Sequence, residues 1–151
     1  MPKIDLDFKK KLNRVEHAYF LSYCYQCGAC VSDCPAAKLS SAFNPREIVL
    51  RVLLGLAEPL LKKDSIIWKC TTCYTCAEVC PQGVSPIEVI TALKNIISAQ
   101  GMLPDNISAS VDIVKDTGRV VLVSEVINKR RGKLGLSELK SVPTDELKKI
   151  I

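Results

Sequence analysis

The chain has 151 residues, about one domain's worth, and its 25% charged and 48% hydrophobic residues exclude a disordered or fibrous protein. The net charge of +5 is shared between residues 1–100 (+3) and 101–151 (+2). The chain therefore has no basic tail, and its charge distribution argues against a nucleic-acid-binding protein. The longest apolar run, residues 52–57, is far shorter than the roughly 20 residues that cross a bilayer, and we expect no membrane insertion.

The first predicted element is a helix over residues 7–21. Its apolar residues recur at helical spacing, at Phe8, Leu12, Val15 and Tyr19. The only histidine, His17, lies on this helix, and we expect it to pack or face solvent rather than bind a metal. Residues 1–5 are polar and lack the apolar segment of a secretory signal. We therefore expect a cytoplasmic protein whose thiols stay reduced.

The eight cysteines form two copies of one motif, with none left over. The spacing C-x2-C-x2-C-x3-C occurs twice, and each cysteine of the second copy follows its counterpart by 46 residues. A proline follows the fourth cysteine in both copies, as Pro35 and Pro81. The motifs consist of Cys24, Cys27, Cys30 and Cys34, and of Cys70, Cys73, Cys76 and Cys80. The first 100 residues therefore contain an internal duplication.

Each motif leads into a predicted amphipathic helix. Residues 44–47 and 85–88 both place a capping residue first, proline at the first helical position and glutamate at the third. Apolar residues then follow at helical spacing, at Val49, Val52, Leu53, Leu56 and Leu60 in the first copy and at Val89, Leu93, Ile96 and Ile97 in the second. Gly55 falls inside the first helix, and Glu58-Pro59 is expected to kink or end it.

The pattern changes after Gly101, which opens a predicted break in the chain. Residues 119–123 are rich in valine and predict a short strand or an extended docking segment. Residues 128–133 are basic and could bind an acidic partner or be simply solvated, and residues 144–151 predict a short terminal helix. We therefore divide the chain into a helical domain over residues 1–100 and an extension over 101–151 that docks a partner.

The cysteine spacing is typical of iron–sulfur proteins. Three cysteines at intervals of three can wrap three corners of a 4Fe-4S cluster, and the fourth thiolate comes from elsewhere. In two-cluster ferredoxins with this motif, the fourth cysteine of each copy binds the other cluster. We therefore predict two 4Fe-4S clusters, one bound by Cys24, Cys27, Cys30 and Cys80 and the other by Cys70, Cys73, Cys76 and Cys34.

Two other uses of the cysteines fit less well. Structural zinc sites usually employ two separated pairs of ligands, whereas this motif is an unbroken series. Disulfides are geometrically awkward between cysteines three residues apart and rare in a reducing compartment. The chain also lacks a G-x-G-x-x-G sequence and any nucleophile–base pair outside the motifs. We therefore expect electron transfer without a catalytic site or a small-molecule substrate.

With these features the sequence resembles the C subunit of heterodisulfide reductase. The resemblance is carried by the two motifs, by WKCTTCYTC at residues 68–76 and by CPQGV at residues 80–84, and it extends more faintly to residues 118–136. It implies a mainly α fold, with an α-helical ferredoxin-like domain made of two duplicated cysteine-motif and helix units. An irregular C-terminal extension would follow this domain.

The resemblance also implies a function. A protein of this family would relay electrons from a flavin-containing A subunit to a catalytic B subunit or in the reverse direction, and the catalytic partner reduces the disulfide of coenzyme M and coenzyme B. Other functions remain as alternatives. The chain could be a freestanding dicluster ferredoxin or the corresponding subunit of a related complex of sulfur oxidisers. The motif is also shared by the iron–sulfur subunits of glycerol-3-phosphate, lactate and succinate dehydrogenase complexes. A module whose clusters are only structural is a further alternative.

Overall fold

The computed structural model describes the whole chain except residues 1–3, 13–17, 141, 147–148 and 150–151. The chain divides into two units, Met1–Met102 and Leu103–Ile151, each of which is described by itself. The described residues form helices and turns and contain no strand, which confirms the predicted mainly α fold. No described helix combines the length and the apolar character that crossing a membrane requires.

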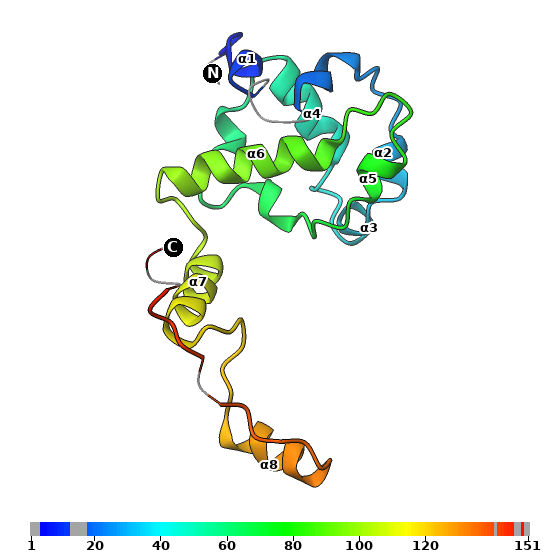
Figure 1. Cartoon of the computed structure of the whole chain (residues 1–151). Helices are drawn as coiled ribbons and strands as arrows, with labels where there is room; N and C mark the ends of the chain where they lie inside the picture. The colour runs from blue at the N-terminus through cyan, green and yellow to red at the C-terminus, as the bar shows by residue number, and fades with distance from the viewer. Residues whose placement is uncertain (1–3, 13–17, 141, 147–148, 150–151) are drawn as a thin grey trace. The chain divides into compact units, whose positions relative to one another are not determined.

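The first unit consists of short helices around two longer ones (Figure 1). The longer helices are α4 (Pro45–Leu53) and α6 (Pro86–Ala99), which pack against each other. The short helices α2 (Ala29–Ser32) and α5 (Thr75–Glu78) also lie side by side. The remaining elements are α1 (Phe8–Leu12), η1 (Ala18–Tyr23), α3 (Pro35–Leu39), η2 (Glu58–Leu60) and η3 (Ile66–Lys69).

The hydrophobic core lies between α4 and α6. One face of α6 is buried along its length, and the apolar stripe of α4 packs onto it. Side chains from α1, η1 and η3 close the core from other directions. Its most deeply buried members include Leu12, Leu21, Val49, Val52, Ile67, Leu93 and Ile97. Burial of these side chains stabilises the unit by about 1.5–3 kcal/mol each, which fixes the helices that precede and follow the cysteine motifs.

The two predicted helix starts differ in their capping. Both α4 and α6 begin at a proline, as predicted. The Asn44 side chain accepts a hydrogen bond from the Glu47 backbone N–H at 3.1 Å, which is the expected N-cap contact. Ser85 makes no such side-chain contact and adopts a left-handed conformation with a φ of +50°. The capping prediction was therefore wrong for the Ser85 side chain.

Gly55 ends α4 rather than lying inside it. Its φ is +71°, and its N–H donates to the carbonyl of Val52 while the N–H of Leu56 donates to the carbonyl of Arg51. This pair of bonds is the Schellman motif, in which the left-handed residue stops the helix. The carbonyl of Gly55 also accepts the N–H of Asp5 at 2.9 Å. Gly55 thus ties the N-terminal segment to the end of α4.

The predicted helix over residues 7–21 corresponds to α1 and η1 in its described parts. Val15 and His17, on which part of that prediction depended, lie outside the described residues. Helical structure is therefore supported at the two ends of this segment only.

The second unit contains two helices that were not predicted, α7 (Asp105–Thr117) and α8 (Glu125–Lys133). Residues 119–123 connect them without forming a strand, so the strand alternative was wrong. The basic residues 128–133 lie in α8, and neither helix has a buried residue. Half of the predicted helix over residues 144–151 lies outside the described residues, and residues 144–146 of that segment are not helical.

Candidate metal centre

The two cysteine loops share one backbone conformation. Gln26 and its counterpart Thr72 have φ values of +63° and +56°, and Gly28 and its counterpart Tyr74 have values of +87° and +62°. Such left-handed residues reverse the chain locally, and for residues other than glycine they cost about 1–2 kcal/mol each. The duplication seen in the sequence therefore extends to strained turns at matching positions, and strain of this kind is concentrated at functional sites.

The first motif lines a hollow together with one cysteine of the second motif. We call it the first hollow, and its wall contains Cys24, Cys27, Cys30 and Cys80. Other parts of its wall come from the Gln26 turn, from Val84, and from the starts of α4 and α6 through Arg46, Val49 and Pro86. Cys80 and the turn that Pro81 opens thus reach across to the other motif.

A second hollow has the reciprocal composition. Its wall contains Cys34, Cys70, Cys73 and Cys76, so that the fourth cysteine of the first motif joins the first three of the second. The rest of this wall is mostly apolar and includes Phe43, Pro45, Ile87 and Ile90. The structure therefore brings all eight cysteines together in two sets of four, and none of them forms a disulfide.

Both hollows suit a group with several metal atoms. Within the described part of the chain, no three His, Cys, Asp or Glu side chains converge on a position for a single metal ion. In a 4Fe-4S cluster each of the four thiolates is held at a separate corner of the cage, so the cysteines surround a volume rather than a point.

Two of the cysteines need a cation to be held as thiolates. Burial, with a smaller effect of the neighbouring cysteines, raises the pKa of Cys30 to about 11. Burial also raises the pKa of Cys76 to about 12. Bound iron would favour the deprotonated form of both side chains, because a coordinated thiol loses its proton. At the exposed Cys73 the contact with the Thr75 side chain lowers the pKa instead.

Hydrogen bonds reach the sulfur atoms of several cysteines. Gln26 Nε2 donates to Cys24 Sγ at 3.2 Å, and the Val84 backbone N–H donates to Cys80 Sγ at 3.3 Å. Cys73 Sγ and Thr75 Oγ1 lie 3.4 Å apart. Hydrogen bonds to cluster sulfurs are among the factors that set the reduction potential of an iron–sulfur site. The sequence spacing did not identify Gln26, Val84 or Thr75 as members of the site.

A cation also lies beside the second motif. Lys94 Nζ donates to the Cys70 carbonyl at 3.3 Å and lies 5.6 Å from the centre of the Trp68 ring. The buried Trp68 Nε1 has no hydrogen-bond partner among the described residues. Lys94 therefore fixes the backbone at the start of the second cysteine loop, a role that no sequence signal indicated.

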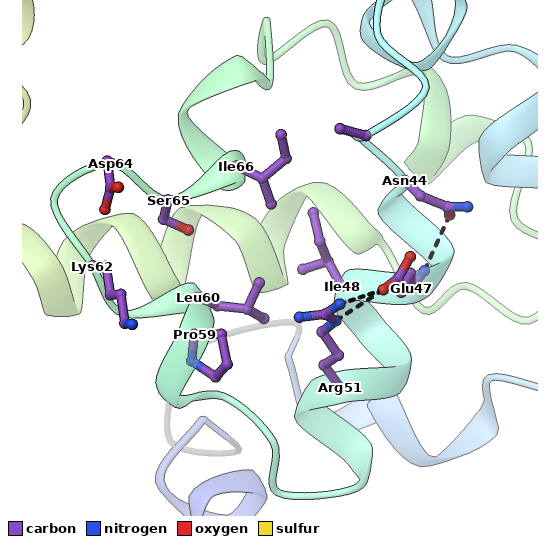
Figure 2. Close-up of a pocket in the computed structure, with 11 residues that line it drawn as sticks. Asn44, Glu47, Ile48, Arg51, Pro59, Leu60, Lys62, Asp64, Ser65 and Ile66 are labelled. Atoms are coloured by element: carbon purple, nitrogen blue, oxygen red, sulfur yellow. Dashed lines mark hydrogen bonds and ion pairs between the residues drawn. The ribbon is translucent and has the colours of Figure 1, made fainter. Parts of the chain in front are cut away.

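A larger hollow elsewhere in the first unit contains no cysteine (Figure 2). It lies between α4 and the segment containing η2 and η3, and its wall includes Lys62 and Asp64. Arg51 and Glu47 on α4 form an ion pair at its edge. This hollow offers no set of thiolate donors, so the candidate metal centre is confined to the cysteine hollows.

Comparison with known proteins agrees with this chemistry. The family model of the 4Fe-4S dicluster domain matches residues 20–84. This match, together with the eight cysteines, shows that the cofactors are two 4Fe-4S clusters.

Several curated proteins are similar over most of the chain. The iron–sulfur C subunit of the CoB–CoM heterodisulfide reductase of Methanopyrus kandleri is 32% identical over 140 residues, which are 88% of this chain and 72% of that protein. The iron–sulfur C2 subunit of the enzyme from Methanocaldococcus jannaschii is 41% identical, over 75% of this chain and 59% of that protein. The C subunit of the ferredoxin/F420H2-dependent enzyme of Methanosarcina acetivorans is 35% identical, over 85% and 78% respectively. The chain thus spans three fifths to four fifths of these relatives.

Proposed function

The chain belongs to the family of iron–sulfur C subunits of heterodisulfide reductase, and we propose that it relays single electrons between two other subunits of such a complex. These partners would be the flavin-containing A subunit and the catalytic B subunit, assembled in the cytoplasm. The observation that carries the proposal is the presence of two four-cysteine hollows in one helical unit. Two one-electron centres in one unit can accept an electron from one partner and deliver it to another.

The proposed ligands are those of the two hollows. Cys24, Cys27, Cys30 and Cys80 would bind one cluster, and Cys34, Cys70, Cys73 and Cys76 the other. The grouping of the cysteines supports this assignment, because each hollow takes three cysteines from one motif and the fourth from the other. When bound, each cluster supplies one-electron redox chemistry. Each set of ligands would also join the two repeats covalently through the metal centre.

Other side chains of the chain would support the electron transfer. Buried residues such as Val49, Ile87 and Ile90 exclude water from the inner walls of the hollows. By contrast, Cys27 and Cys73 are exposed and occupy the same position in the two motifs. These two cysteines offer the shortest approach from the surface to each site, so the partners would dock over them. Short distances matter because electron transfer between proteins needs a close approach of the two centres.

We also propose that residues 1–100 form the cluster-binding domain and that residues 101–151 dock one of the partners. Four consecutive apolar side chains of the extension are exposed: Val120 is 73%, Val121 66%, Leu122 59% and Val123 36% accessible. In the same unit, the basic side chains of α8 include the exposed Lys129 and Arg130. Exposed apolar and basic groups of these kinds are suited to protein binding.

Anaerobic purification of the tagged, full-length chain from cells that make it naturally would test the proposed function. The expected result is co-purification of a flavin-containing chain and of a second cysteine-rich chain, with two clusters per copy of the tagged protein. A reducible dicluster protein that purifies alone would favour a freestanding ferredoxin. Co-purification with a membrane anchor would indicate a different dehydrogenase complex.

A further inference from the structure

The walls of the two hollows differ at equivalent positions of α4 and α6. The second residue of α4 is Arg46, which is exposed and lines the first hollow, whereas the second residue of α6 is the buried Ile87, which lines the second hollow. The fifth residues, Val49 and Ile90, line the same two hollows and are both aliphatic. The duplicated architecture thus places an arginine in the wall of one site and an isoleucine in the wall of the other.

Hydrogen bonding to sulfur differs in the same direction. The first hollow has two donors to cysteine sulfur, the half-buried Gln26 side chain and the buried Val84 backbone. Among the cysteines of the second hollow, Cys73 is exposed to solvent and is contacted by Thr75 and Thr71, and the buried Cys76 has a hydrogen bond from the Ile87 backbone. A hydrogen bond to a charged group gains more away from water than in contact with it. The first hollow thus has two donors to sulfur atoms that are partly shielded from water and the second hollow has one, so the donors of the first hollow stabilise added negative charge more strongly.

Burial of the ligands adds to this difference. Cys34 and Cys76 in the second hollow are each only 9% exposed, and no cysteine of the first hollow is as buried. Each one-electron reduction adds a negative charge to a site that is already anionic. This charge is less favourable where water is excluded and no cation lines the wall.

Lys94 acts in the opposite direction, as does the exposed Lys69, which precedes Cys70 and contacts Ser40. Lys94 is half-buried and lies near the second motif, where its positive charge favours reduction. Its ammonium group contacts the Cys70 carbonyl and the Trp68 ring rather than a sulfur atom, and it does not line the second hollow. We therefore expect its effect to be smaller than the combined effect of Gln26, Val84 and Arg46.

We propose that Gln26, Val84 and Arg46 give the first hollow the higher reduction potential, so that a single electron added to the protein resides there. This inference rests on the ligand sets proposed above. It sets a direction inside the unit, in which an electron that enters at the second hollow passes spontaneously to the first. The partner that donates electrons would then approach Cys73, and the partner that accepts them would approach Cys27.

An anaerobic redox titration of the full-length holoprotein with dithionite, followed by EPR spectroscopy, tests the proposal. The two signals can be assigned with Cys27→Ser and Cys73→Ser, each of which alters the ligand field of one site. If either substitution prevents assembly of its cluster, the remaining signal belongs to the other hollow, so the assignment still succeeds. We expect the signal that Cys27→Ser changes to appear first during reduction.

Substitution of the wall residues tests the cause of the difference. Arg46→Ile introduces the side chain found at the equivalent position of the second hollow, and Gln26→Leu removes the donor to Cys24. Each change should make reduction of the first site roughly threefold to tenfold less favourable, where tenfold corresponds to ~59 mV for one electron. The second site should change little. Arg51→Ile is the matched control, because it removes the same charge from a position on α4 where the arginine pairs with Glu47 (Figure 2).

The inference is overturned if the second hollow is reduced first, or if Arg46→Ile shifts the potentials no more than Arg51→Ile. A different result would refute the proposed function, namely a protein that binds no reducible clusters. A protein with two reducible clusters in the reverse order would refute only the inference about their potentials.

Discussion

Cys34 and Cys80 each close one cysteine motif in the sequence, and each lies in the wall of the hollow formed by the other motif. The prolines that follow them open α3 after Cys34 and a turn after Cys80. The two repeats therefore complete each other's sites. Neither repeat alone supplies four cysteines to one hollow, which explains why a duplicated chain is needed for this arrangement.

Removal of iron should unfold most of the helical unit. Each hollow takes cysteines from both motifs, so iron bound there links the two repeats, and this link is lost when the metal is removed. Treatment with a chelator under anaerobic conditions should abolish most of the circular dichroism at 222 nm, and reconstitution with iron and sulfide should restore it. An apo-protein that keeps its helical signal and unfolds cooperatively on heating would contradict this expectation.

Gly55→Ala should destabilise the protein more than Gly101→Ala. Both residues have left-handed φ values, +71° and +70°, so alanine is strained at either position. A Cβ atom at Gly55 would lie 2.5 Å from the carbonyl oxygen of Asp5, whereas one at Gly101 would meet no atom within 4 Å. We expect Gly55→Ala to cost about 1–3 kcal/mol more than Gly101→Ala.

Thermal unfolding of the two holoproteins under identical anaerobic conditions provides the measurement. The Gly101→Ala variant serves as the control, since it introduces the same backbone strain without the steric conflict. Equal midpoints for the two variants would mean that the Asp5 segment moves away without cost.

Asn44→Ala should destabilise α4 by about 1 kcal/mol, because the Asn44 side chain accepts the Glu47 N–H at the helix start. Ser85→Ala is the control at the start of α6, where the serine side chain makes no capping bond. The unfolding midpoint should fall for Asn44→Ala and remain nearly unchanged for Ser85→Ala. A larger loss for Ser85→Ala would show that Ser85 has a role in the holoprotein beyond capping.

Leu93→Ala should cost about 2–5 kcal/mol, since Leu93 on α6 is fully buried in the core. Leu39→Ala, at a side chain that is 90% exposed, should have an effect within about 0.5 kcal/mol of zero. Comparison of their thermal midpoints would show whether α6 is the central element of the core. A stability loss at Leu93 no larger than at Leu39 would contradict this packing.

Much of the site could be predicted because cysteine spacing is closely coupled to cluster geometry. The repeat of 46 residues, the proline after each fourth cysteine and the start of α4 at Pro45 were all readable in the sequence. The cysteine grouping in the two hollows agrees with the predicted ligand sets. The ligation itself stays a prediction, as does the division between a cluster-binding domain and a docking extension.

Other features depend on contacts between distant residues, which a local pattern does not reveal. Gly55 lies within an apolar helical pattern in the sequence, and that pattern does not reveal the contact of its backbone with Asp5. In the sequence Arg46 looks like an ordinary solvated residue. Only the structure shows that α4 places it in the wall of the first hollow. The helix α7 was missed because its start at Asp105 lacks a side-chain cap and none of its residues is buried.

The central claim is that each cluster is bound by three cysteines of one motif and the fourth of the other. The most direct test is to record Mössbauer and EPR spectra of the Cys34→Ala and Cys80→Ala holoproteins. The signals of the two clusters are assigned beforehand with the variants Cys73→Ser and Cys27→Ser. We predict that Cys34→Ala damages the cluster whose signal Cys73→Ser alters, and that Cys80→Ala damages the cluster whose signal Cys27→Ser alters. The reverse pairing, in which each fourth cysteine affects the cluster of its own motif, would contradict the account.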